Sequence, residues 1–145
     1  MKLLNISSPI KLILHIMKNL FLLLSLTIFC SCSGDDCVND VVGTYNGTCT
    51  STSGTLTGSM NIFKSPEGGS KVAIEEGISF ISGFMGDLSG NCNTISVESQ
   101  SVVDINGVSV TISGTLHVNG SSLTGELTFD RGATESVCSY NLEKG

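Results

Sequence analysis

Beyond residue 40, apolar and polar positions alternate along the chain with a period of two. Residues 110–118 place Val, Ile, Gly, Leu and Val on one face and Thr, Ser, Thr and His on the other, and residues 123–129 repeat this arrangement. Successive side chains of a β-strand point to opposite faces of the sheet, so the alternation is typical of antiparallel strands with one buried face. No helical period is visible beyond Asp40. The pattern predicts an all-β domain.

Turn-forming residues separate these segments at intervals that are typical of sandwiches and barrels. Asn106-Gly107 indicates a type I′ hairpin turn. In an up-and-down meander with an even number of strands, the first strand is antiparallel to the last, so the sheet can close and lose its edges. We predict a closed barrel, with a two-sheet sandwich as the alternative. The eight predicted strands span residues 41–50, 55–64, 70–76, 78–87, 93–103, 108–118, 122–130 and 135–142.

The N-terminal region has a different pattern. Residues 20–30 are almost uninterruptedly apolar, and Lys18 precedes them. This is the layout of a secretory signal peptide, and the run is shorter than the roughly 20 apolar residues of a membrane-spanning helix. We therefore expect residues 1–31 to be a signal peptide rather than a transmembrane anchor, and we derive the fold from the residues that follow.

Small residues and a cysteine end this segment, which resembles the signal of bacterial lipoproteins, where the cysteine is acylated and becomes the first mature residue. The resemblance implies a small residue before that cysteine. Ser31 precedes Cys32, whereas the bulky Phe29 precedes Cys30. Cys32 is therefore the predicted lipid-bearing residue, which would carry palmitate or a similar acyl chain and tie the protein to a membrane. Residues 32–40 would form the lipidated tether, and residues 41–145 the barrel domain.

Acidic residues follow this cysteine at once. The stretch Ser33-Gly34-Asp35-Asp36 is similar to the export signal that sends lipoproteins of the Bacteroidota type to the cell surface. The resemblance implies an outer-membrane, lipid-anchored protein that faces outward, with Asp35 and Asp36 as the signal. The alternative is a solvated, disordered tether, for which Ser, Gly and Asp are equally suited, on a protein that faces the periplasm.

The charge and length of the mature chain limit its possible functions and its number of domains. After removal of residues 1–31 the chain has four basic and thirteen acidic residues, a formal charge of −9. Such a chain offers no basic surface to a phosphate backbone, so nucleic-acid binding is excluded. The mature length suits one domain with a single core.

Four cysteines remain after Cys32, and an even number in an exported protein indicates two disulfides. Their wide spacing does not fit a zinc site, and we expect neither a metal nor a cofactor. In a closed meander, Cys49 ends the first strand near the start of the last, which carries Cys138. Cys37 and Cys92 precede the first and fifth strands at the opposite end. We therefore expect the pairs Cys49–Cys138 and Cys37–Cys92.

Two aromatic residues are candidate ligand contacts inside the barrel. The segment Val42-Gly43-Thr44-Tyr45 resembles the Gly-x-aromatic start of lipocalin-like barrels. The resemblance implies that the Tyr45 ring plugs the barrel floor. Phe129 lies on the apolar face of its strand and is expected to line the interior.

Apolar residues fall on both faces of one predicted strand, in the stretch GISFISGFMGDLSG. Phe80, Ile81, Phe84 and Met85 cannot all point to one side of a regular strand. Either the strand is covered on both faces, or one face presents an apolar patch to a partner. Phe80, Phe84 and Met85 are therefore candidate contact residues.

Catalytic constellations are missing from the sequence. His117 is the only histidine after the signal segment and falls on the polar face of its strand, so no nucleophile and base can be paired. Glu75 and Glu76 precede Gly77 and are interpreted as a solvated turn. We therefore do not expect an enzyme.

Two functions from different classes remain. The first is a surface-exposed, lipid-anchored binding module for a small apolar ligand or a glycan. The second is a protein-interaction role, as an accessory subunit or an enzyme inhibitor. A roomy interior would favour the first, and a filled interior with Phe84 outside would favour the second.

Overall fold

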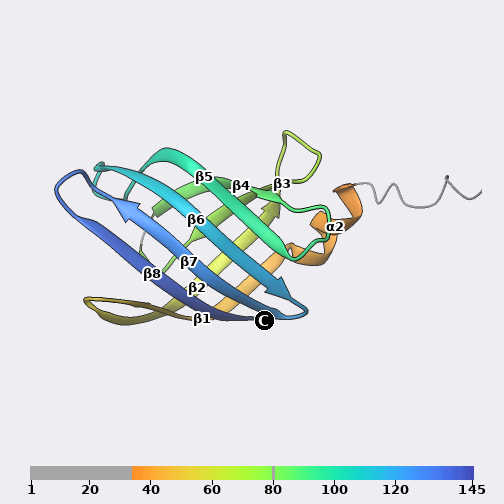
Figure 1. Ribbon diagram of the computed structural model, residues 1–145, viewed down its shortest axis with the longest axis horizontal. Coiled ribbons are helices and arrows are strands. Elements are labelled where there is room, and N and C mark those ends of the chain that lie inside the picture. The colour runs from red at the N-terminus through yellow and green to blue at the C-terminus, as the bar shows by residue number, and fades with distance from the viewer. Residues whose placement is uncertain (1–33, 80) are drawn as a thin grey trace, which may run out of the picture. The chain divides into compact units, whose positions relative to one another are not determined.

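The fold is an antiparallel β-barrel of eight strands. The computed structural model describes residues 34–79 and 81–145, with only the backbone for residues 34–36. Figure 1 shows the strands winding in chain order around one interior. After helix α2 (Gly34–Val41), the strands are β1 (Gly43–Ser51), β2 (Gly54–Lys64), β3 (Lys71–Glu76), β4 (Ile81–Leu88), β5 (Thr94–Val103), β6 (Ser109–Asn119), β7 (Ser122–Asp130) and β8 (Glu135–Lys144).

The sheet closes between its first and last strands. β8 pairs with β1 from Tyr45↔Lys144 to Thr50↔Ser139, and every other strand pairs with its neighbours in the sequence. This closure confirms the predicted barrel and is incompatible with a two-sheet sandwich. All eight predicted strands are present, and the largest shift of a boundary is at β4, which begins at Ile81.

Inward-facing side chains fill the barrel. Alternate positions are buried along strands such as β6 and β7, as the period of two predicts. The largest side chains that are less than 2 % exposed belong to Tyr45, Met60, Ile62, Ile74, Ile95, Ile112, Leu116, Leu123, Leu127 and Leu142, with Val38 and Val41 of α2. The interior is thus a packed core.

A β-bulge explains why the apolar residues of β4 do not follow strict alternation. Ile74 pairs with Phe84, but Glu76 pairs with Ile81, so β4 has one more residue than β3 between these pairs. The extra residue returns the chain to the same face, and Ile81 and Phe84 both point inward. Phe84 therefore does not belong to an exposed apolar patch, the second of the two alternatives, because strict alternation does not hold across a bulge.

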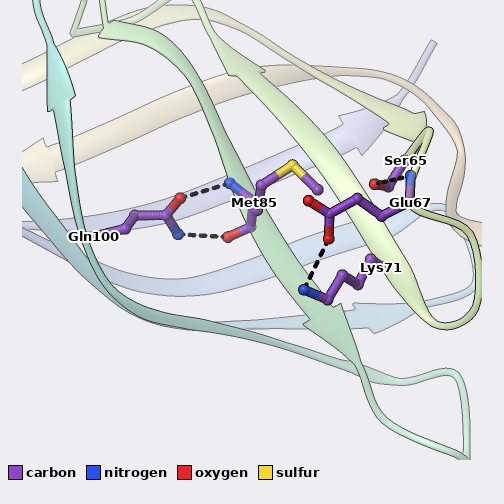
Figure 2. Close-up of polar contacts among 5 residues, drawn as sticks. All are labelled: Ser65, Glu67, Lys71, Met85 and Gln100. Carbon is purple, nitrogen blue, oxygen red and sulfur yellow. Dashed lines mark hydrogen bonds and ion pairs between the residues drawn. The ribbon is translucent and has the colours of Figure 1, made fainter.

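The next seam, between β4 and β5, has a short hydrogen-bond ladder. Its register pairs are Asp87↔Ser96 and Leu88↔Ile95, and β5 has its own bulge between Val97 and Gln100. Figure 2 shows the Gln100 carboxamide against Met85: its oxygen accepts from the Met85 N–H at 2.9 Å, and its nitrogen donates to the Met85 carbonyl at 2.7 Å. One side chain thus replaces a backbone partner where the two strands separate.

Within the expected tether, residues 34–40 belong to helix α2, so the alternative of a disordered tether does not hold for them. Cys37, Val38 and Val41 lie at helical spacing on one face and are at most 2 % exposed. These three apolar side chains close one end of the barrel, and this burial explains why so short a segment is helical. With only eight residues, the apolar pattern of this segment was too short to distinguish a helix from an unstructured tether.

Two disulfides tie the chain together, in the pairs that strand direction predicts. Cys37 of α2 is bonded to Cys92 in the β4–β5 turn, with 5.0 Å between the Cα atoms. Cys49 of β1 is bonded to Cys138 of β8, with 5.6 Å between the Cα atoms. The first bridge holds α2 against the barrel, and the second crosses the closing seam.

The β5–β6 turn differs from the predicted type I′ form. Gly107 has a φ of 79°, but among the described residues the only non-glycine with positive φ is Cys92. Asn106 therefore lacks the positive φ that a type I′ turn requires. The Asp104 carboxylate instead accepts from the N–H groups of Asn106 at 2.8 Å and Val108 at 3.0 Å. The side chain of Asp104 shapes this turn.

Candidate functional site

The two ends of the barrel are built differently. α2 and the turns around residues 65–70, 89–93 and 120–121 form one end, called here the helix end. The turns around residues 52–53, 104–108 and 131–134, with residues 77–79, form the other, called the loop end. Figure 1 shows α2 and the β7–β8 turn at opposite ends of the strands.

A buried carboxylate organises the loop end. Glu76 is 2 % exposed and its side chain points into the barrel. Its two oxygens accept hydrogen bonds from the N–H of Ile78 at 3.1 Å, the N–H of Ser79 at 2.7 Å, and the hydroxyl of Tyr140 at 3.1 Å. The Ser79 hydroxyl donates a longer bond, of 3.4 Å. Glu76 thus holds the β3–β4 turn and links it to β8 across the interior.

Burial sets the protonation of this pair. Desolvation raises the pKa of the Glu76 carboxyl above its ordinary value, although the hydrogen bonds from Ser79, Tyr140 and Ile78 act in the opposite direction. Desolvation, and next the Glu76 charge, raise the pKa of Tyr140, so the phenol stays protonated and donates. Because both oxygens of the Glu76 carboxylate accept hydrogen bonds from the protein, this carboxylate acts as a structural group.

Glu76 corrects the interpretation of Glu75-Glu76 as a solvated turn. Glu75 is exposed, whereas Glu76 is buried. The sequence did contain the signal, because Val72, Ile74 and Glu76 occupy alternate positions of one strand and therefore share its inward face. The interpretation as a solvated turn followed the general rule that charged residues are exposed and did not follow this alternation.

A small hollow opens at the mouth of the barrel. Its volume is about 260 Å³. Serines 51, 53, 79 and 136 surround it, with Arg131 as its only charged residue and Leu56, Ile78, Phe129 and the Cys49–Cys138 disulfide as its apolar part. The hollow lies between the turn residues of the loop end, outside the packed core.

A larger groove lies on the same end, beside the β3–β4 and β5–β6 turns. Its volume is about 510 Å³. Apolar side chains come from Ile81, Val103 and Ile105, and carboxylates come from β3 and from Asp104. The surface called the groove below is lined by Asn61, Glu75, Glu76, Gly77, Ile81, Ser82, Gly83, Val103, Asp104 and Ile105.

The predicted contact residues are not brought together. Tyr45 is fully buried at the helix end, where its hydroxyl donates to the Val41 carbonyl at 2.9 Å. Phe84 is 2 % exposed inside the barrel, and Met85 is half-buried in the wall. Phe129 is also 2 % exposed and reaches the mouth hollow. These four do not form one binding surface.

Several predicted residues lie outside the described part of the chain. Cys32 and Phe80 belong to this group. Asp35 and Asp36 are described by their backbone alone, in the first turn of α2. The lipidation and export predictions therefore stay predictions.

His117 is exposed on the outer wall beside Thr94, with 3.4 Å between the ring nitrogen and the hydroxyl. Within residues 34–79 and 81–145, no three His, Cys, Asp or Glu side chains gather as metal ligands would. The same residues include no helix of the length and hydropathy needed to cross a bilayer.

No protein-family model matches the chain, and no curated protein matches it.

Proposed function

We propose that this chain is a non-catalytic, lipid-anchored protein of the outer membrane that faces the cell surface and binds a protein partner, as an accessory subunit or an inhibitor. The observation that carries the proposal is the contrast between a filled interior and a loop end with exposed aliphatic side chains. Ile105 is 71 % exposed and Val103 is 49 % exposed, in the same turn region.

The interior argues against a small apolar ligand held inside the barrel. Ligand pockets usually have volumes of about 300–1,000 Å³ and enclose most of the ligand. The inward positions here are occupied by large, fully buried side chains such as Met60, Ile112 and Leu127. A ligand would have to displace packed side chains, which costs several kcal/mol in a well-packed core.

A small polar ligand such as a glycan is the second candidate, and the mouth hollow favours it. Its serines and Arg131 offer hydrogen-bond donors, and Phe129 offers an apolar surface. At about 260 Å³ the hollow lies below the usual size of a ligand pocket. A single sugar ring is the most it would hold, so the protein-partner proposal is preferred.

The position of α2 supports an outward-facing loop end. α2 begins at Gly34, two residues after Cys32 in the sequence. An acyl chain on Cys32 would therefore hold the helix end close to the membrane, and the loop end lies at the far side of the barrel. Exposed aliphatic side chains at that far side would meet partners rather than lipid.

Metabolic labelling with palmitate tests the anchor. Wild-type protein and a Cys30→Ala variant should take up label, and a Cys32→Ala variant should not. Label on the Cys32→Ala variant together with its loss from the Cys30→Ala variant would make Cys30 the acylated residue and contradict the proposal.

Protease treatment of intact cells tests surface display. The wild-type domain should be degraded, and a double variant with Asp35→Ala and Asp36→Ala should be protected. Carboxylates in the first turn also stabilise a helix by about 0.3–1 kcal/mol each, so the control replaces both residues by Glu and keeps their charge. Equal protection of all three proteins would contradict surface export.

Crosslinking of intact cells with a water-soluble carbodiimide, which couples carboxylates to amines, tests the partner. Exposed carboxylates lie at both ends of the barrel, with Glu67 at the helix end and Glu75 and Glu135 at the loop end. The chain should be recovered in one discrete complex with a second protein. Recovery of the uncrosslinked chain alone, at all reagent concentrations, would count against a protein-interaction role.

A further inference from the structure

We propose that the groove is the docking site for a protein segment in which a Lys or Arg side chain stands next to an aliphatic one. This inference rests on the proposed protein-interaction function and names its surface and the chemistry of its partner. Three observations carry it: exposed aliphatic side chains, carboxylates without basic neighbours, and walls that are held in place.

The first observation is the aliphatic surface of the β5–β6 turn. Val103, Ile105 and Val108 are 49 %, 71 % and 46 % exposed, within six consecutive residues. Ile81, which is 5 % exposed, lies at the apolar floor of the groove. Clustered exposed aliphatic residues of this kind mark interaction sites on soluble domains. An aliphatic group of a partner would bury this surface.

Charge is the second observation. Glu75 and Asp104 line the groove, and its lining includes no Lys, Arg or His. The exposed Glu75 carboxylate makes no hydrogen bond or ion pair within the described part of the chain. Asp104 accepts its two turn hydrogen bonds through Oδ1. Its second carboxylate oxygen is left for a ligand, so a cation is the complementary group.

The third observation is the rigidity of the walls. The Ser82 hydroxyl donates to the Val103 carbonyl, and a β-bridge joins Ile81 to Asp104 across the groove. Further along the same seam, Gln100 binds both backbone groups of Met85 (Figure 2). A surface that is already ordered loses less conformational entropy when it binds.

A protein segment fits this surface better than a small cation. The aliphatic surface continues beyond the groove onto Val108, which is absent from the groove lining. A small amine inside the groove would leave Val108 exposed, whereas a polypeptide would cover both. The volume of about 510 Å³ has room for a few side chains of such a segment.

Site-specific photo-crosslinking in the full chain tests the proposal. A diazirine amino acid replaces Ile105 in the groove or, as the control, the exposed His117 on the outer wall, in cells that display the protein in its own membrane. Illumination should crosslink the Ile105 position to a protein and leave the His117 position unmodified. The crosslinked peptide of the partner should contain Lys or Arg within two residues of Val, Ile or Leu.

Charge variants in the same cells test the cation. Glu75→Gln should lower the crosslinking yield at position 105 by roughly threefold, since exposed ion pairs have that strength, and Glu75→Lys should lower it further. The matched control is Glu67→Gln, which removes an exposed carboxylate at the helix end, where Glu67 is paired with Lys71. It should leave the yield unchanged.

Each other outcome overturns the inference in a recognisable way. A protein crosslink at His117 and none at Ile105 would remove the groove and keep the protein-interaction function. A small-molecule adduct at Ile105 in the intact mass would replace the protein segment by a small ligand. A crosslinked segment without basic residues, or a yield unaffected by Glu75→Lys, would refute the charge argument. No crosslink at either position would refute the groove, while carbodiimide crosslinking separately decides the function.

Discussion

The two ends of this barrel close their interior by different chemistry. At the helix end, Val38 and Val41 of a separate helix cover the core, and the Cys37–Cys92 disulfide holds them there. At the loop end, a turn of the barrel itself closes the core, and the buried Glu76 carboxylate holds that turn. One closure is apolar and covalent, and the other is polar and hydrogen-bonded.

Each end also has one tyrosine that completes its closure. The Tyr45 hydroxyl donates to a neutral acceptor, the Val41 carbonyl of α2. The Tyr140 hydroxyl donates to Glu76, an ionisable acceptor. The Lys144 ammonium lies 5.7 Å from the centre of the Tyr45 ring and donates to the Asp40 carbonyl, so the C-terminal strand also braces α2. The tyrosine at the helix end thus donates to an acceptor that does not titrate, whereas the tyrosine at the loop end donates to one that does.

The largest effect is expected from a charge placed under α2. Val38→Asp puts an unpaired carboxylate where the side chain is fully buried, and we expect the free energy of unfolding to fall by roughly 3–5 kcal/mol. Urea unfolding of the full chain measures this. Val137→Asp, on the outer wall where Val137 is 40 % exposed, is the control and should cost less than about 0.5 kcal/mol. A small loss for Val38→Asp would mean that α2 is a dispensable tether.

The disulfides come next in size. Replacing both cysteines of either bridge by Ala should lower the free energy of unfolding by roughly 2–4 kcal/mol. The bridged residues are 55 and 89 positions apart, and in the chain-entropy model this difference favours Cys49–Cys138 by only about 0.4 kcal/mol. Proteolysis separates the ends: loss of Cys37–Cys92 should expose α2 to early cleavage, and loss of Cys49–Cys138 should not. Equal cleavage of α2 in both variants would contradict that assignment.

The same contrast explains which parts of the structure could be predicted from the sequence. Period-two alternation, as in residues 110–118, reports which face of a strand is buried, so the strands and the closed meander were predictable. The direction of the strands then limited the disulfide pairs. α2 was not predictable, because three apolar residues within eight are too few to establish a helical period.

The candidate site was less predictable because it depends on departures from regularity. The bulge in β4 turned Phe84 inward, and a bulge leaves little trace in a hydrophobic pattern. The groove depends on Glu75 of β3 and on Val103 and Asp104 at the end of β5, which the pairing of β3, β4 and β5 brings together. Glu76 could have been found, since it continues the inward positions of Val72 and Ile74.

A pair of tyrosine variants compares the two closures directly. Tyr45→Phe removes a neutral hydrogen bond and should cost about 0.5–1.5 kcal/mol, whereas Tyr140→Phe removes a bond to a carboxylate and should cost about 1.5–3 kcal/mol. Both hydroxyls are buried, so the difference isolates the acceptor. Urea unfolding at neutral pH measures both. Equal costs would show that the Glu76–Tyr140 bond is no stronger than an ordinary one.

The smallest expected effect is a pH dependence that belongs to the loop end. Burial raises the pKa of Glu76 in the folded protein above its ordinary value of 4.5. Between the ordinary pKa and the folded pKa, the folded state therefore binds more protons than the unfolded state. The contribution of Glu76 to the free energy of unfolding should therefore be fully present below pH 4.5 and be lost as the pH rises through the folded pKa. Glu76→Gln should remove this slope, because an amide does not titrate, whereas Tyr45→Phe at the helix end should retain it. Urea unfolding of the three proteins over this pH interval decides the matter, through the difference in free energy of unfolding between each variant and the wild type. This difference should change with pH for Glu76→Gln and stay constant for Tyr45→Phe; a constant difference for Glu76→Gln would assign the proton to another group.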